Sequence, residues 1–223
     1  MYQELVLNND PKSIISETIR TLRTNLQFTS VDKKLKTILI TSSVPGEGKS
    51  FIAANLAVAF AQSGSRVLLV DCDIRKGRQH YIFGCHNQKG LSNLLLENVE
   101  EKYSEYIQET KIKNLSVMFR GVTPPNPSEL LGSEKNKELI KILKDKYDII
   151  IFDSAPINGG LTDSLIMGTL VDGVGIVSAY KETPISLLNN TKKSLENVNA
   201  NILGVVLNRA NSKSKKYYGH YYG

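Results

Sequence analysis

Short runs of apolar residues recur along the chain at lengths typical of β-strands. They cover residues 37–40, 67–70, 115–119, 149–152, 174–177 and 202–207. Each run is nearly continuous in apolar residues, as expected for parallel strands whose two faces are both covered. Helix-like segments lie between the runs. This alternation predicts an α/β fold with a doubly wound, mainly parallel sheet.

Two of the helical segments are well defined by sequence. The segment FIAANLAVAFAQSG, residues 51–64, ends at Gly64, a residue suited to a helix C-terminus. Residues of about 13–30 also predict a helix, with an apolar stripe along one side. The stripe is made of Ile14, Ile15, Thr18, Ile19, Leu22 and Leu26.

The last residues follow neither a helical nor a strand pattern. The ending YYGHYYG holds four of the ten tyrosines, Tyr217, Tyr218, Tyr221 and Tyr222, and it follows the basic run SKSKK. We therefore predict one domain over residues 1–210 and a disordered, tyrosine-rich tail over residues 211–223. Four exposed phenol groups matter most in a protein that transfers phosphoryl groups.

Composition and charge narrow the class of protein. The 223 residues suit a single α/β domain, and no apolar run approaches the length of about 20 residues that spans a bilayer. Cys72 and Cys85 are the two cysteines, so we expect a reducing cytoplasm and no disulfide framework. The formal net charge is +6. Since no helix-turn-helix, zinc or RNA-binding signature accompanies it, we expect a solvated basic tail and no nucleic acid partner.

A glycine-rich loop lies between the first predicted strand and the helix that follows it. It places Gly46, Gly48, Lys49 and Ser50 in the context that a P-loop requires, in a relaxed form because Ser43 stands where the strict pattern has glycine. Backbone N–H groups and the helix N-terminus then form an anion site. We expect ATP and Mg²⁺ here, with Lys49 near the β- and γ-phosphates and Ser50 on the metal. The expected nucleotide-binding residues are Gly46, Glu47, Gly48, Lys49, Ser50 and Phe51.

Carboxylates follow two of the predicted strands. RVLLVDCDIR ends a strand with Asp71 and Asp73, and YDIIIFDSAP ends another with Asp153, as in a Walker B motif. Ligands of open parallel sheets bind at the carboxyl ends of the strands, where these acids fall. Alternation along an extended strand predicts that Asp71 and Asp73 lie on one face. The other interpretation is that these acids only solvate turns.

The combined motifs resemble the bacterial protein-tyrosine kinases of capsule and exopolysaccharide synthesis. Within that family the chain resembles the stand-alone cytoplasmic type of Gram-positive bacteria. The matching segments are PGEGKS (45–50), VDCDIR (70–75), GVTPPNPSELL (121–131), IIIFDSAP (149–156), ETIRTLR (17–23) and the tyrosine tail. At Gly77 the chain departs from the proline that family members often have.

The resemblance implies a P-loop kinase of the Min/Par-like class and a set of residue roles. Lys49 and Ser50 would bind phosphate and Mg²⁺, and Asp73 and Asp153 would contribute to the metal site. Asp71 would be the base for the incoming tyrosine, although roles within the Asp71/Asp73 pair stay open. Catalytic residues would thus be Lys49, Asp71, Asp73 and Asp153, and the phosphate acceptors Tyr217, Tyr218, Tyr221 and Tyr222.

The same resemblance implies partners and an assembly. Glu17, Arg20 and Arg23 match an element that mediates a ring of subunits, commonly eight, and Asn208 and Arg209 would contact the adenine. A transmembrane adaptor of the polysaccharide co-polymerase type would activate the kinase and recruit it from the cytoplasm to the inner face of the membrane. A cognate tyrosine phosphatase would act on the tail.

Three hypotheses about function stay open at this point. In the first, the chain is an ATP-dependent tyrosine kinase that phosphorylates the tail of a neighbour within a ring. In the second, it is a non-kinase ATPase switch of the Min/Par type, whose signature lysine would stand at the position of Val44. In the third, the tail is a docking peptide and the P-loop only regulates assembly. The tyrosine tail and the valine at position 44 favour the first.

Overall fold

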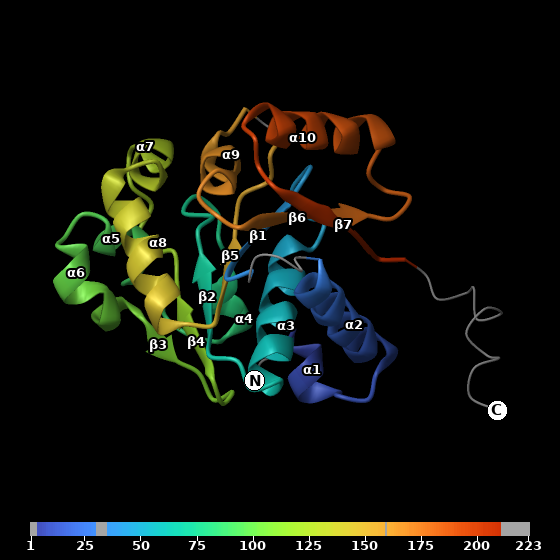
Figure 1. The fold of residues 1–223 in the computed structure, drawn as a ribbon, viewed down its shortest axis with the longest axis horizontal. Helices are drawn as coiled ribbons and strands as arrows, with labels where there is room; N and C mark the ends of the chain where they lie inside the picture. Colours follow the sequence, from blue (N-terminus) through green and yellow to red (C-terminus); the bar gives the residue numbers. More distant parts are fainter. Residues whose placement is uncertain (1–3, 30–34, 159, 211–223) are drawn as a thin grey trace.

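A single sheet organises the computed structural model, which describes residues 4–29, 35–158 and 160–210 (Figure 1). In the described part of the chain the sheet has seven strands in the order β3-β4-β2-β5-β1-β6-β7, and every pair except β3 with β4 is parallel. The predicted tail, with its four tyrosines, lies outside the described residues. The strands are β1 (Thr37–Ser42), β2 (Val67–Asp71), β3 (Gln108–Glu109), β4 (Leu115–Met118), β5 (Ile149–Asp153), β6 (Gly173–Ala179) and β7 (Ile202–Asn208).

The predicted doubly wound, mainly parallel sheet is confirmed. All residues of β1, β2, β5 and β6 are buried, which accounts for their continuous apolar sequences. The two-residue strand β3 was not predicted, because so short a segment carries no hydrophobic pattern. Each of the six predicted strands is present, with ends that differ by one or two residues.

Helices cover both faces of the sheet (Figure 1). The helix α3 packs with α1 and α2 on one face, and α8, α9 and α10 contribute to the apolar core on the other. No helix within the described ranges is long and apolar enough to span a membrane. The helices are α1 (Val6–Asn9), α2 (Ile14–Phe28), α3 (Lys49–Gln62), α4 (Gln79–Ile82), α5 (Leu91–Leu94), α6 (Val99–Lys102), α7 (Pro127–Leu131), α8 (Glu134–Lys146), α9 (Asp163–Gly168) and α10 (Ile185–Asn197), with a 3₁₀ turn at Tyr103–Tyr106.

The predicted N-terminal helix is present as α2, but its predicted apolar stripe is only partly buried. Ser13 caps the helix by accepting a hydrogen bond from the amide of Ser16. The apolar contacts with the core begin at Ile19 and continue to Leu26. Ile14 and Ile15 are 66% and 51% exposed, because nothing in the described structure covers the first turn.

The strand order brings the ends of β1, β5 and β2 to one edge of the sheet. In register, Asp153 at the end of β5 lies opposite Asp71 at the end of β2 and opposite Ile40 of β1. The loop after β1 therefore starts beside both carboxylates. This edge is where parallel α/β sheets bind their ligands.

The buried Asn55 of α3 fastens the N-terminal segment to the domain. Its Oδ1 accepts from the amide of Leu7 at 3.4 Å, and its Nδ2 donates to the carbonyl of Glu4 at 2.9 Å. An Asn55→Leu substitution would leave both backbone groups without their partner.

We predict that Asn55→Leu lowers the free energy of unfolding by about 1–3 kcal/mol, the usual cost of unpaired buried polar groups. Urea denaturation measures this change, and hydrogen exchange should become faster at the Leu7 amide. The matched control is Asn190→Leu on the exposed side of α10. Unchanged exchange at Leu7 would contradict the prediction.

Candidate functional site

The loop of residues 43–48 connects β1 to α3 and forms the predicted phosphate cradle. Gly46 and Gly48 adopt φ angles of 87° and 94°, in the left-handed region that favours glycine. Gly48 is the N-cap of α3, and a Cβ placed on it would come within 2.1 Å of the Asn208 side chain. Backbone geometry and space therefore both require glycine at position 48. The strand, loop and helix stand in the order that the P-loop motif predicted.

The side chain of Glu47 accepts hydrogen bonds from within the phosphate cradle and from the neighbouring strand β6. Its Oε2 accepts from the Val44 amide at 2.8 Å, and its Oε1 accepts from the Ala179 amide at 3.1 Å and from the Thr183 hydroxyl. The Glu47 side chain is buried, so it fastens the loop to the end of β6. Sequence reasoning included Glu47 among nucleotide-binding residues but gave no sign of this role, since Thr183 is far away in sequence.

The end of β7 also contacts the cradle. The Nδ2 of Asn208 donates to the Glu47 carbonyl at 2.8 Å, and Arg209 donates from Nη2 to the Gly46 carbonyl at 2.6 Å. Arg209 also pairs with Glu182. The two residues predicted to lie near the adenine are thus placed beside the phosphate loop, while their contact with adenine stays a prediction.

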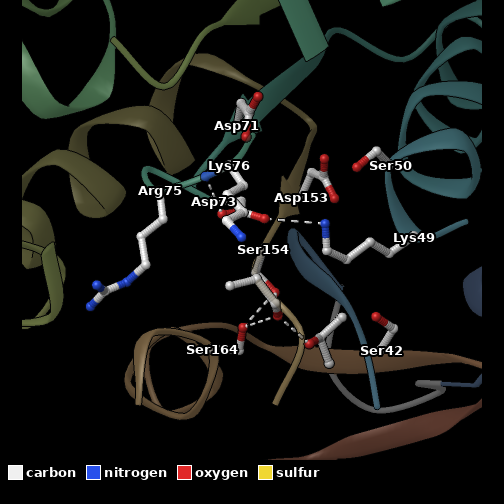
Figure 2. Close-up of polar contacts among 12 residues, drawn as sticks. Ser42, Lys49, Ser50, Asp71, Asp73, Arg75, Lys76, Asp153, Ser154 and Ser164 are labelled. Atoms are coloured by element: carbon white, nitrogen blue, oxygen red, sulfur yellow. Dashed lines mark hydrogen bonds and ion pairs between the residues drawn. The ribbon is translucent and has the colours of Figure 1, made fainter. Parts of the chain in front are cut away.

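Lys49, the first residue of α3, points to the acidic edge of the sheet (Figure 2). Its Nζ lies 3.2 Å from Oδ2 of Asp73, and only 13% of its side chain is exposed. Burial by itself would lower the pKa of Lys49, but the nearby carboxylates of Asp153, Asp73 and Asp71 together raise it. Lys49 is therefore a firmly charged group. Ser50, next along α3, is buried beside Asp153.

Asp71 and Asp153 are fully buried and sit opposite each other in register. Oδ2 of Asp71 accepts from the Gln79 backbone amide at 3.0 Å, and Oδ2 of Asp153 accepts from Gln79 Nε2 at 2.8 Å. Within the described structure the Oδ1 atom of each has no hydrogen-bond partner. Burial raises the pKa of both carboxyls, most strongly for Asp71, where the charge of Asp153 adds to the effect. For Asp153, Lys49, Ser50 and Gln79 oppose the rise.

The predicted placement of Asp71 and Asp73 on one strand face is wrong in that form, because β2 ends at Asp71. Beyond it the chain turns, and the amides of Cys72 and Asp73 both donate to the Asp153 carbonyl, at 2.8 and 3.1 Å. Asp73 therefore meets Lys49 while Asp71 lies apart from that ion pair (Figure 2). The two acids occupy different environments.

Arg75 fastens the segment after β2 to two helices, a role that sequence reasoning missed. Its Nε donates to the buried carboxylate of Asp163, at the start of α9, at 2.7 Å. The Ser128 hydroxyl of α7 donates to the same carboxylate at 2.5 Å and accepts from Arg75 Nη2 at 3.2 Å. The PPNPSELL segment, through Ser128, thus stabilises the turn that carries Asp73.

The oxygen atoms at this edge fit the chemistry of Mg²⁺. The metal prefers one or two carboxylates together with substrate phosphates. The unpaired Oδ1 of Asp153, the Ser50 hydroxyl and the Asp73 carboxylate are the candidate protein ligands. Among the described residues no three His, Cys, Asp or Glu side chains form a metal site by themselves.

The residues predicted for assembly lie on α2. Glu17 and Arg20 form an ion pair at 2.5 Å on its exposed surface. Arg23 turns toward α3 and donates to the Ala59 carbonyl at 3.4 Å. The predicted phosphate acceptors Tyr217, Tyr218, Tyr221 and Tyr222 lie outside the described residues.

Known proteins share both the sequence and the fold of this chain. The family described as AAA domain matches residues 35–203. Over 221 residues the chain is 39% identical to Tyrosine-protein kinase YwqD of Bacillus subtilis, covering 99% of this chain and 92% of that protein. It is also 39% identical to CapB of Staphylococcus aureus over 219 residues, 98% of this chain and 95% of that protein.

Solved structures of related proteins share the fold of this chain. The crystal structure of the chimerical protein CapA2B2 has a TM-score of 0.88 and 41% identity, covering 94% of this chain and 91% of that chain. The septum site-determining protein MinD of Pyrococcus horikoshii, complexed with Mg-ADP, has a TM-score of 0.64 and 26% identity over 79% of this chain and 71% of that chain. The predicted P-loop fold of the Min/Par-like class is confirmed.

We predict that Asp71→Asn stabilises the nucleotide-free protein at pH 7.5. Burial raises the pKa of Asp71 in the native state above its unfolded value, so its charge opposes folding at pH values above the native pKa. Removing the charge should raise the free energy of unfolding by about 1 kcal/mol or more. The gain should shrink as the pH falls through the raised native pKa of Asp71, since protonation then removes the same charge from the wild type.

Urea denaturation of both proteins at several pH values, without nucleotide or metal, measures this difference. The control is Asp145→Asn, which removes an exposed carboxylate. An Asp71→Asn variant that is less stable than wild type at pH 7.5 would show that the charge is compensated in the native state.

We predict that Glu47→Gln weakens ADP binding. A glutamine side chain cannot accept all three hydrogen bonds that Glu47 receives, and an unmatched buried donor costs about 1–3 kcal/mol. Part of that loss should loosen the cradle and raise the Kd for ADP, as calorimetry measures. The matched control is Glu138→Gln on the exposed side of α8. An unchanged Kd would show that the loop keeps its shape without these contacts.

Proposed function

The chain belongs to the family of bacterial tyrosine-protein kinases, and on that premise we propose that it transfers the γ-phosphoryl group of ATP to tyrosines of its own C-terminal tail in a second copy. The observation that carries the proposal is the placement of one lysine and three carboxylates around the phosphate cradle. Lys49 of α3, Asp71 of β2, Asp73 of the turn after β2 and Asp153 of β5 meet at one edge of the sheet.

The phosphates of ATP would bind the backbone amides of residues 46–50 and the charge of Lys49. A bound Mg²⁺ would neutralise charge on the phosphates, held by Ser50, Asp153 and Asp73. In the described structure Lys49 pairs with Asp73. The phosphates of ATP would compete with Asp73 for Lys49. We therefore expect Asp73 to leave its ion pair with Lys49 and to bind the metal instead.

In the transfer step the tyrosine oxygen attacks the γ-phosphorus, and the bond from that phosphorus to the β–γ bridging oxygen breaks. ADP leaves with that oxygen. The phenol proton passes to Asp71, whose pKa burial and the neighbouring Asp153 raise above that of an ordinary carboxyl. Its Oδ1 has no partner in the described residues and would accept the proton. Because Asp71 is fully buried and Gly77 packs against its Oδ1, the chain at Gly77 must shift before a tyrosine can reach that oxygen.

Assembly would follow from α2. Glu17 and Arg20 already lie on its exposed surface, and Ile14 and Ile15 add exposed apolar area beside them. A head-to-tail interface that uses this surface would close into a ring, which we propose to contain eight subunits. Arg23 contacts α3 in the described structure, so it would support the helix from within.

The tail is long enough to serve a neighbour. If fully extended, a segment of the length of residues 211–222 could reach about 40 Å at about 3.3 Å per residue. Each phosphate adds about −1.5 to −2 charges, so four phosphates would reverse the formal net charge of +6 and loosen the docking of the tail. The names of relatives suggest a role in capsule or exopolysaccharide synthesis. We propose that a transmembrane adaptor recruits the kinase from the cytoplasm to the membrane and that a tyrosine phosphatase reverses the reaction.

Mixing two full-length variants tests the reaction and its direction. The first carries Lys49→Met, which keeps the tyrosines but removes the charge of the cradle. The second carries phenylalanine at positions 217, 218, 221 and 222, which keeps the cradle but removes the acceptors. After incubation with Mg-ATP, mass spectrometry should find phosphate on Tyr217 to Tyr222 of the Lys49→Met chain in the mixture and none on that chain alone.

The remaining outcomes separate the hypotheses. Phosphate on wild type but not on the Lys49→Met chain of the mixture would contradict transfer between copies. No phosphate on wild type, even with an adaptor segment added, would contradict the kinase proposal and favour an idle ATPase with a docking peptide. The matched control is the exposed Lys113→Met, which should leave incorporation unchanged.

A further inference from the structure

Gln79 contacts all three elements that carry the candidate catalytic groups. It is the first residue of α4 and is fully buried. Its backbone amide donates to Asp71 Oδ2 at 3.0 Å, and its Nε2 donates to Asp153 Oδ2 at 2.8 Å and to the Ser50 carbonyl at 3.1 Å. One residue thus joins the ends of β2 and β5 to the first turn of α3.

The chemistry of these contacts fixes the orientation of the amide. The Asp153 carboxylate and the Ser50 carbonyl only accept hydrogen bonds, so both must face the NH₂ group of Gln79. Asp71 and Asp153 end neighbouring strands, which lie about 4.8 Å apart. Two carboxylates at that spacing repel, and Gln79 is a neutral residue that donates to both, through its backbone amide to Asp71 and through its side chain to Asp153.

Gly77 supplies the space that this arrangement needs. A Cβ on Gly77 would lie 2.1 Å from Oδ1 of Asp71, so any other residue would displace the carboxylate. The backbone amide of Gly77 donates to the Asp73 carbonyl at 2.6 Å. Residues 77–79 therefore fold over Asp71 while holding the turn that carries Asp73.

We propose that Gln79 is a positioning residue for phosphoryl transfer, which sets Asp71 and Asp153 relative to each other and to α3, with Gly77 leaving room for Asp71. The inference rests on the proposed function, in which Asp71 accepts the phenol proton and Asp153 holds the metal. Gln79 acts through these acids and not on the substrate. Its loss should therefore lower kcat and weaken metal binding while the phosphate cradle still binds nucleotide.

The kinetic test uses the full chain with two variants that keep the backbone donor to Asp71. Gln79→Met keeps the size and removes the side-chain donors to Asp153 and Ser50, and Gln79→Glu replaces these donors by a charge. The acceptor is the Lys49→Met chain. Disturbing a residue that orients metal ligands costs about 10–100-fold, so kcat should fall by that factor while KM for ATP stays nearly constant. The matched control, Gln88→Met, changes an exposed glutamine nearby and should behave as wild type.

A binding test separates positioning from folding. ADP binding without metal, measured by calorimetry, should match wild type in both Gln79 variants. Binding of Mn²⁺ to the ADP complex, measured by electron paramagnetic resonance, should weaken by about tenfold. Loss of metal-free ADP binding in both variants would show a structural role and overturn the proposal, as would an unchanged kcat in either variant that still binds ADP.

Gly77→Ala tests the space around Asp71 independently. The added Cβ should displace the Asp71 carboxylate and lower kcat with little change in metal-free ADP binding. The matched control is Gly132→Ala, where the nearest atom to a new Cβ is 3.4 Å away. If wild type itself incorporates no phosphate, the proposed function fails. If wild type is active and both the Gln79 and Gly77 variants equal it, only the positioning role fails.

Discussion

Repulsion between two buried carboxylates is the constraint on which the rest of the site depends. Asp71 and Asp153 end neighbouring strands in register, inside a sheet whose two faces are covered by helices. Water cannot screen the two carboxylates there, so nearby protein groups must offset their repulsion. Lys49 supplies positive charge and Gln79 supplies donors, yet one oxygen of each acid stays unpaired in the described structure. The two acids thus present two unpaired oxygen atoms where the proposed function places a metal and a proton acceptor.

This constraint also links nucleotide binding to metal binding. Lys49 neutralises Asp73 in the described structure, and phosphates arriving at the cradle would draw on the same ammonium group. Without a cation, the edge of the sheet would then hold three carboxylates and a polyphosphate around one lysine. A divalent cation restores the balance, since it is shared between phosphate and carboxylate oxygens.

Much of the fold and part of the candidate site could be predicted because their signals are local. Buried parallel strands have continuous apolar sequences, which the sequence shows directly. Lys49 and Asp153 each come within a few residues of the end of a predicted strand. Glu47 contacts Thr183, and Arg75 contacts Asp163. These partners are far apart in sequence, so no motif spacing predicts the contacts.

One prediction failed, and one predicted apolar stripe is only partly buried, for physical reasons that periodicity does not contain. The apolar stripe of α2 includes Ile14 and Ile15, but periodicity reports which side of a helix is apolar and not whether another surface covers it. The alternation that placed Asp71 and Asp73 on one face assumed that the strand continued, whereas the Asp153 carbonyl captures the amides of Cys72 and Asp73 and turns the chain.

In the proposed reaction, access to Asp71 limits transfer more than the length of the tail does. The end of β7 is fastened to the cradle through Asn208 and Arg209, so the tail starts beside its own nucleotide site. A fully extended chain of eight residues, the number of steps from Arg209 to Tyr217, could reach at most about 26 Å, so length alone does not choose between its own site and a neighbour's. Asp71, however, lies closed under Gly77. A partner can shift the equilibrium between the closed and open forms of the chain at Gly77 only if it contacts the two forms differently. Subunit or adaptor contacts that favour the open form would therefore control transfer without touching the phosphate cradle.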